Sequence, residues 1–285
     1  MAIDTSSGIK PVGSIGDFNF YEQDGRTIVR QKASPQGNQR RTPRRMLQRI
    51  KMDNVVAAWQ STMGHLDSLF EKEKPGQSAY NRFVSLNLKE ARVYLTEEER
   101  RNKACVLDRF TVADGSLGIE IEAEERDGWM VSSLSLGGEE LTPETSVARL
   151  FFLLNCNNTF RFLDGDRLHF VRMTQKERNG LGQPDVETEY GCIELGVHNR
   201  HPLYGMVYPD QFAMHDGYLA APARENSMVA WALTREDKKR KRHQCSHAVL
   251  SGSNSLLERY TSDEAIREAL KSYKVKVKYN EQFND

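Results

Sequence analysis

The residues with the clearest chemical potential form one alternation near position 245. His243, Cys245 and His247 make an H-x-C-x-H pattern, and on a strand their side chains would project to one face. Imidazole and thiolate are zinc ligands, but a zinc site needs four of them, commonly in paired units on turns or helices. His198 and His201 would have to complete the set from elsewhere in the chain. We therefore favour ordinary polar and buried roles for these residues, and expect no metal site and no cofactor.

A second group of reactive side chains lies in residues 197–227, a stretch rich in His, Pro, Tyr and Gly that we expect to form a long loop. The group consists of His198, His201, Tyr204, Tyr208, Asp210, His215 and Asp216. This mixture could line a hydrolytic site, because long loops often carry function. Tyr and Met are also enriched in contact surfaces, so we favour an interface loop.

Motifs that identify common enzymes are absent from the sequence. It contains no G-x-S-x-G, no Walker loop, no H-E-x-x-H and no G-x-G-x-x-G. Glu120 and Glu122 stand two apart on an expected strand and could act as a carboxylate pair, but their acidic surroundings are more typical of a solvated sheet face. The sequence therefore predicts a protein that is not an enzyme.

The strongest charge feature is a basic segment, residues 26–51, which contains no acidic residue. Its cations are Arg26, Arg30, Lys32, Arg40, Arg41, Arg44, Arg45, Arg49 and Lys51. On a helix, Arg41, Arg45 and Arg49 would share one face because they are four residues apart. Phosphates attract such a cluster, although it lacks aromatic side chains for base stacking. The candidate residues for nucleic-acid binding or subunit docking are Arg40, Arg41, Arg44, Arg45, Arg49 and Lys51.

An acidic band, residues 119–144, offers these cations a partner within the protein itself. Its carboxylates are Glu120, Glu122, Glu124, Glu125, Asp127, Glu139, Glu140 and Glu144, with Arg126 and Arg149 nearby. A basic arm and an acidic band in a chain of formal net charge +0 suit head-to-tail self-assembly, in which the arm of one copy meets the band of the next. We favour protein docking over nucleic-acid binding, with a plain solvated face as the third alternative.

A second basic run, KKRKR, occupies residues 238–242. Such runs are typical of nucleic-acid patches. Because this one lies between two expected strands, we interpret it as the solvated tip of a hairpin. The two basic segments could still meet one phosphate backbone if they fold to the same side.

The elements that must position these side chains divide the chain into three parts. Residues 1–42 form an N-terminal hairpin and basic arm, with its turn at Asp24-Gly25. Residues 43–104 form a helical module, in which a helix expected over 43–72, with a bend at Gly64, starts after Thr42. Ser78 caps a second helix, and the run from Thr96 has the capping-box spacing of a third.

Residues 105–285 form a β-rich body with further short helices. Strands are expected over 106–112, 117–123, 129–136, 166–173, 186–195, 228–234, 246–251 and 273–279. Helices are expected after Thr142-Pro143 and over 262–272. Strands interrupted by a few helices, without βαβ regularity, predict an α+β fold.

Composition excludes several broad classes. Charged residues make up 28% of the chain and apolar residues 38%, and no apolar stretch is long enough to span a membrane. The first sixteen residues lack a basic start followed by an apolar run, so we expect no secretory signal peptide. Cys105, Cys156, Cys192 and Cys245 form no C-x-x-C pair and are expected to be reduced.

Nearly the whole chain resembles one family. The segments that carry the likeness are GSIGDFNFYEQDGRTIVRQK, TPRRMLQRIKMDNVVAAW, QSAYNRFVSLNL, VYLTEEERRNKACVLDRFTVADGSL, FLDGDRLHFV, AWALTR and LLERYTSDEAIREALKSY, in that order. They are similar to a poorly characterised group of proteins encoded by Bacteroidetes genomes and their phages or prophages. The resemblance implies a virion, assembly or DNA-handling role, and its motifs are structural rather than catalytic.

Charge, motifs and resemblance together predict a non-enzymatic phage virion structural or assembly protein, such as a tail, neck or head-associated component. It would act through contacts with further copies or other virion proteins, away from membranes, and would be assembled in the bacterial host cytoplasm. The alternative is a nucleic-acid-binding protein that contacts DNA phosphates through residues 26–51.

Overall fold

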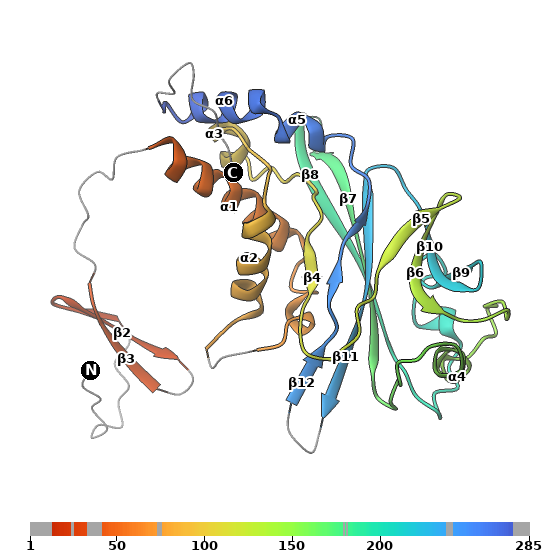
Figure 1. The fold of residues 1–285 in the computed structure, drawn as a ribbon. Helices are drawn as coiled ribbons and strands as arrows, with labels where there is room; N and C mark the ends of the chain where they lie inside the picture. The colour runs from red at the N-terminus through yellow and green to blue at the C-terminus, as the bar shows by residue number, and fades with distance from the viewer. Residues whose placement is uncertain are drawn as a thin grey trace.

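A computed structural model of the chain describes residues 13–23, 26–32, 42–72, 76–178, 180, 182–237 and 242–275 (Figure 1). Antiparallel sheets and several helices share the fold, so the expected α+β class is confirmed. The fold has three layers. A long central sheet lies in the middle, helices pack against one of its faces, and a second sheet with a further helix packs against the other.

The central sheet has the order β12–β11–β7–β8, with the short strand β14 (Ser251–Gly252) paired to β11 beside β12. Its members are β7 (Arg167–Arg178), β8 (Gln183–Glu194), β11 (Ser227–Asp237) and β12 (Arg242–Cys245). Strand β11 is buried on both faces. Val229, Trp231 and Leu233 enter one core, and Met228 and Ala230 enter the other. A strand that is buried on both faces has a continuous run of apolar residues, and β11 has such a run.

The second sheet has the order β5–β6–β10–β9. It consists of β5 (Ala123–Arg126), β6 (Trp129–Ser135), β9 (Ala213–His215) and β10 (Tyr218–Pro222). Helix α4 (Val147–Asn157) packs beside β6, and its Leu150 and Leu154 are fully buried in the core that this sheet shares with β7 and β11. The short 3₁₀ helix η2 (Leu203–Gly205) contributes the buried Leu203 to the same core.

Helices cover the opposite face of the central sheet. Helix α1 (Pro43–Ser61), the 3₁₀ turn η1 (Asp67–Leu69) and helix α2 (Ala79–Glu90) share a core with β7 and β11. Within it, Trp59 packs at 5.2 Å from Phe83, measured between ring centroids. Helices α3 (Glu97–Arg101), α5 (Leu257–Thr261) and α6 (Asp263–Ser272) complete the fold at one end of α1, where α6 buries Ile266 and Leu270 (Figure 1).

Two smaller sheets remain. Strands β4 (Thr111–Ala113) and β13 (Ala248–Val249) form an antiparallel pair beside α2. Strands β1 (Gly13–Ile15), β2 (Phe18–Gln23) and β3 (Arg26–Gln31) form a three-stranded N-terminal sheet that stands apart from the rest of the chain in Figure 1. Ile15, Phe18 and Tyr21 are 66%, 48% and 40% exposed, so this sheet keeps large apolar side chains at the surface.

Several predicted elements are confirmed. The hairpin around Asp24-Gly25 has its two flanking strands, although the turn itself lies outside the described residues. Ser78 caps α2 by accepting a hydrogen bond from the backbone of Asn81. Thr96 and Glu99 form the reciprocal capping box of α3, and Ser262 caps the last helix.

Other boundaries were wrong, and each has a local cause. The first helix ends at Ser61 rather than at 72, because Met63 and Gly64 adopt φ values of 50° and 85°. The fourth helix starts after Ser146, which accepts a hydrogen bond from the backbone of Arg149, and not after Thr142-Pro143. The expected loop 197–227 contains β9 and β10. The strand expected over 273–279 lies mostly outside the described residues, and Tyr273 forms the C-cap of α6.

All four cysteines are free thiols, as expected, with Cys105 and Cys245 buried and Cys156 exposed. Burial raises the pKa of the Cys245 thiol to about 12, so it stays protonated at neutral pH. Across the part of the chain that the structure describes, no helix has both the length and the apolar character needed to cross a membrane.

Candidate functional site

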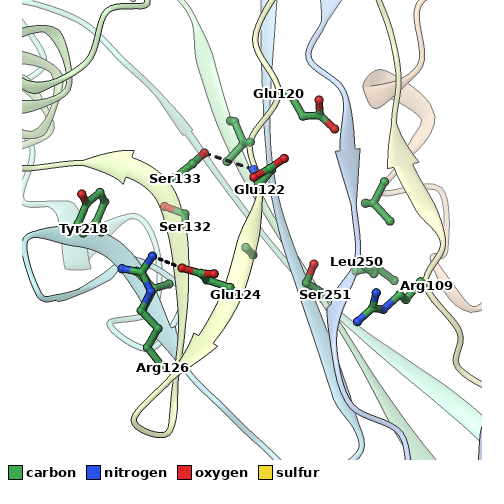
Figure 2. Close-up of a pocket in the computed structure, with 14 residues that line it drawn as sticks. Arg109, Glu120, Glu122, Glu124, Arg126, Ser132, Ser133, Tyr218, Leu250 and Ser251 are labelled. Atoms are coloured by element: carbon green, nitrogen blue, oxygen red, sulfur yellow. Dashed lines mark hydrogen bonds and ion pairs between the residues drawn. The ribbon is translucent and has the colours of Figure 1, made fainter.

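The candidate site is a groove between the two sheets, bounded by β5 on one wall and by β13 and β14 on the other (Figure 2). It encloses about 590 Å³. The segment leading into β5 runs beside β13 at a parallel bridge between Glu120 and His247. Beyond that bridge the walls are lined by Glu122 and Glu124 on one side and by Leu250 and Ser251 on the other.

The alternation of the sequence 120–124 builds the acidic wall. Ile121 is 1% exposed in the core, and Ala123 packs against that core. Their neighbours Glu120, Glu122 and Glu124 project to the opposite face and are all exposed. The prediction of a solvated acidic sheet face therefore describes this wall, which is also one side of a groove.

The cations near the acidic wall neutralise only some of its carboxylates. Arg126 forms an ion pair with Glu124 and lies over the ring of Tyr218, with 5.7 Å from its guanidinium carbon to the ring centroid. His247 contacts Glu120 at 4.0 Å and would neutralise it only when protonated. Glu122 forms no ion pair with any described residue, and only its backbone is engaged, by Ser133. Arg109 is exposed on the far wall.

Both walls end in sheet edges. Strand β5 is the terminal strand of its sheet and pairs only with β6, while β14 pairs only with β11 among the described strands. An edge strand presents unpaired backbone N–H and C=O groups, which can accept a further strand from another chain. The groove thus places exposed carboxylates beside two strand edges, β5 and β14, that lie close to each other.

The predicted basic cluster is divided between two elements. Arg26 and Arg30 are exposed on β3, and Arg44, Arg45 and Arg49 are exposed on α1. None of the three arginines on α1 forms an ion pair with a described residue. Arg40 and Arg41 lie outside the described residues.

Lys51 differs from the rest of the predicted cluster. It is only 7% exposed, and its ammonium lies over the Tyr94 ring at 5.6 Å from the centroid. Its position on the inner side of α1 leaves it unsuited to a surface contact, because a ligand would have to displace Tyr94.

The predicted acidic band is only partly available. Glu139 is held by Arg149, whose hydrogen bond lowers the pKa of that carboxyl. Glu124 is paired as described above, whereas Glu125, Glu140 and Glu144 form no ion pair with a described residue. The second basic run lies where expected, between β11 and β12, but residues 238–241 are outside the described part of the chain.

The residues of the predicted loop 197–227 separate into different environments. Asp210 forms ion pairs with the buried Arg172 and with Arg224. Tyr204 donates a hydrogen bond to the carbonyl of Phe212 at 3.2 Å. His198, His201 and Tyr208 are exposed, and His215 and Asp216 stand at the turn between β9 and β10. Of these residues, His215 and Asp216 lie 3.5 Å apart, while Asp210 and Tyr204 are engaged with other groups.

The H-x-C-x-H residues form two separate contacts. His243 Nε2 donates to the carbonyl of Ser68 at 2.6 Å and lies 3.3 Å from Cys245 Sγ. His247 instead contacts Asp114 at 3.2 Å. Because the Cys245 thiol keeps its proton, the pair of His243 and Cys245 lacks the thiolate that a nucleophile needs.

Sequence reasoning missed the far wall of the groove. Arg109, Leu250 and Ser251 line it from segments that lie far from β5 in the sequence, and no local pattern predicts their meeting. Tyr218 was hidden in the expected loop, although Asp216-Gly217 before it is a hairpin signal of the same kind as Asp127-Gly128.

Comparison of the chain with protein-family models, with curated proteins and with solved structures finds no match.

Proposed function

We propose that this protein is a non-enzymatic structural or assembly subunit of a phage virion, in a tail, neck or head-associated position, and that its copies associate by docking the basic N-terminal sheet of one into the acidic groove of the next. The phage role rests on the resemblance of the segments named above. Assembly would then take place in the host cytoplasm.

The main support for the proposal is that the spacing of arginines on β3 equals the spacing of carboxylates on the groove wall that ends in β5. Arg26 and Arg30 are four residues apart on one face of β3, and Glu120 and Glu124 are four apart on one face of the groove wall. Four residues of strand span about 13 Å in either case. Because the bridge between Glu120 and His247 occupies the start of this wall, a β3 edge laid along β5 would bring one arginine opposite Glu124, and the other arginine would approach Glu120 through its side chain alone.

The exposed apolar side chains of the N-terminal sheet support the same occupant. Ile15 and Phe18 are not covered by any buried core of the described residues. On the far wall of the groove Leu250 is fully buried, whereas Val249 is partly exposed. A second copy that inserts this sheet would remove from water the apolar surface of Ile15 and Phe18 together with the exposed part of Val249, which stabilises the contact beyond its charge pairs.

Light scattering on the purified full-length chain tests the proposal. Association should appear at low salt and weaken at high salt, because exposed charges are screened over about 10 Å at roughly 0.1 M ionic strength. Two variants locate the contact. One reverses Arg26 and Arg30 to Glu, and the other reverses Glu120, Glu122 and Glu124 to Lys.

Each variant alone should be monomeric, and a mixture of the two should associate again because the charges then match. Matched controls reverse exposed charges on α6: Arg267→Glu with Lys271→Glu for the arm, and Glu264→Lys with Glu268→Lys for the groove. These should associate as the unaltered chain does. A monomer under all conditions, or association that neither variant weakens, would refute the docking.

Nucleic-acid binding is the second candidate, and the exposed arginines of α1 favour it. Arg44, Arg45 and Arg49 are exposed, and Arg49 also interacts electrostatically with Asp53. Duplex DNA added in the same experiment would then raise the scattering mass, and binding should fall by about 0.9 log units per log unit of salt for each phosphate contacted. Reversal of these three arginines to Glu should abolish that shift. An unchanged mass in the presence of DNA would exclude this function.

A further inference from the structure

Side chains from two hairpin turns of the second sheet approach each other, although the turns follow opposite ends of the β6–β10 pair, where Trp129 lies opposite Pro222 and Tyr218 lies opposite Ser135. Asp127-Gly128 joins β5 to β6, and Asp216-Gly217 joins β9 to β10. Both aspartates adopt left-handed backbone conformations, with φ of 49° at Asp127 and 51° at Asp216, as the first central residue of a tight hairpin turn requires. One carboxylate from each turn lies close to the last residue of β9.

That last residue is His215, and it completes a set of three potential ligands. One ligand atom from each of Asp127, His215 and Asp216 lies within 4.8 Å of the other two. Among the described residues this is the one such group of His, Cys, Asp or Glu side chains. His215 Nε2 and Asp216 Oδ2 are 3.5 Å apart, close to the roughly 3.4 Å edge of a tetrahedron with bonds of about 2.1 Å.

The imidazole of His215 is fixed in place and has a nitrogen without a partner. Its ring stacks on Trp129 with centroids 5.3 Å apart and an interplanar angle of 11°. Nε2 is shielded from solvent and forms no hydrogen bond, and its 3.5 Å separation from Asp216 is too long for a good one. Buried polar atoms almost always have a partner, so a shielded nitrogen without a hydrogen bond, 3.5 Å from one carboxylate and grouped with a second, fits a site for a bound cation.

We propose that Asp127, His215 and Asp216 bind a divalent transition-metal ion of the Zn²⁺ class. A neutral imidazole nitrogen and two carboxylate oxygens suit such an ion, and the two negative charges balance its own. Three protein ligands leave a further coordination position for water. The ion would tie the β5–β6 hairpin to the β9–β10 hairpin, and so would hold β5, which forms one wall of the groove.

Metal titration of the tag-free, chelator-treated full-length chain tests the site. Zn²⁺ should bind at one equivalent by calorimetry and raise the melting temperature. Co²⁺ should bind in its place with visible absorption bands of a low-coordinate site. Because Trp129 stacks on His215, Co²⁺ should also quench part of the tryptophan fluorescence, and Trp129→Phe should remove that component.

His215→Ala and, separately, Asp216→Asn should each weaken Zn²⁺ binding at least tenfold and abolish the thermal shift. His198→Ala and His201→Ala, at exposed positions, should leave both unchanged. If His215→Ala fails to fold, Asp127→Asn provides a second test, because it changes a single carboxylate in a turn and should also weaken Zn²⁺ binding. Equal Zn²⁺ binding in His215→Ala and the unaltered chain would overturn the proposal, as would loss of binding in a His198 or His201 variant instead.

Discussion

The carboxamide of Asn54 pairs with both backbone groups of Val106. Asn54 Nδ2 donates to the Val106 carbonyl at 2.9 Å, and the Val106 N–H donates to Asn54 Oδ1 at 2.8 Å. Asn87 makes the same double contact with Thr111 at 3.0 and 2.7 Å. These side chains of α1 and α2 act as substitutes for a neighbouring strand, and so they fix the segment that leads into β4.

Replacement of Asn54 by Leu should lower the free energy of unfolding by about 3 kcal/mol, because two buried backbone groups of Val106 would lose their partners. Asn54 is only 2% exposed, so water cannot take over. Urea denaturation followed by circular dichroism measures the change. Gln48→Leu, at an exposed position of the same helix, is the control and should shift stability by less than about 0.5 kcal/mol.

These amide contacts also explain why the strand expected over 106–112 was wrong. Its apolar residues are buried as those of a strand would be, but the backbone N–H groups of Val106 and Leu107 donate to the side chains of Asn54 and Gln175, and β4 begins only at Thr111. Local pattern predicts burial in this segment. It cannot predict which distant group will satisfy the backbone.

The same limit applies to the candidate site. The acidic face of β5 and the basic face of β3 follow from alternation and charge, which are local properties of the sequence. The far wall of the groove depends on how two sheets pack, and the approach of Asp127 to His215 depends on how two hairpins pair within one sheet. Neither arrangement produces a local pattern in the sequence from which it could be predicted.

Acid should destabilise the protein through His169. Its ring nitrogens bond to Tyr190 Oη at 2.7 Å and Thr234 Oγ1 at 2.8 Å, and burial lowers the pKa of His169 to about 3. The unfolded chain takes up a proton near pH 6.5 and the folded chain does not, so stability falls as the pH drops from about 6.5 towards 3. The slope from this residue is about 1.4 kcal/mol per pH unit.

His169→Gln should remove this pH-dependent component. Between about pH 6.5 and pH 5 the unaltered chain should lose roughly 2 kcal/mol more stability than the variant does. Urea unfolding at a series of pH values gives the difference, in which the contributions of other groups cancel. His198→Gln, exposed in a loop, should keep the pH slope of the unaltered chain. Parallel pH profiles for His169→Gln and the unaltered chain would contradict the assignment.

Arg172 should be far more important for stability than Arg224, although both contact Glu189 and Asp210. Arg172 is fully buried, and its guanidinium also donates to the carbonyls of Asp210 and Pro222, each at 3.2 Å. Arg172→Met should destabilise the fold by about 2–3 kcal/mol, because the two carbonyls lose their buried donor, while Glu189 and Asp210, each about a third exposed, keep only Arg224 as a cation. Arg224 is 41% exposed, so Arg224→Met should cost about 1 kcal/mol or less. Comparable losses in chemical denaturation would show that the buried network is not formed.

Gly252 should be intolerant of any side chain, because β14 lies against the backbone of β11. A Cβ at this position would stand 2.3 Å from the Ser227 carbonyl oxygen and 3.0 Å from Met228 Cα, and the φ of 143° is unfavourable for other residues. Backbone atoms of a central strand cannot move aside. Gly252→Ala should therefore destabilise the protein by about 2–4 kcal/mol from the clash and the backbone strain together.

Gly138→Ala is the matched control, since nothing lies within 4 Å of its Cβ and its φ is not in the positive range. It should leave thermal unfolding nearly unchanged. Because Ser251 beside Gly252 lines the groove, Gly252→Ala should also weaken self-association at temperatures where the variant remains folded. A Gly252→Ala protein that melts with the Gly138→Ala protein would mean that β14 does not lie against β11, and the far wall of the groove would then lose its support.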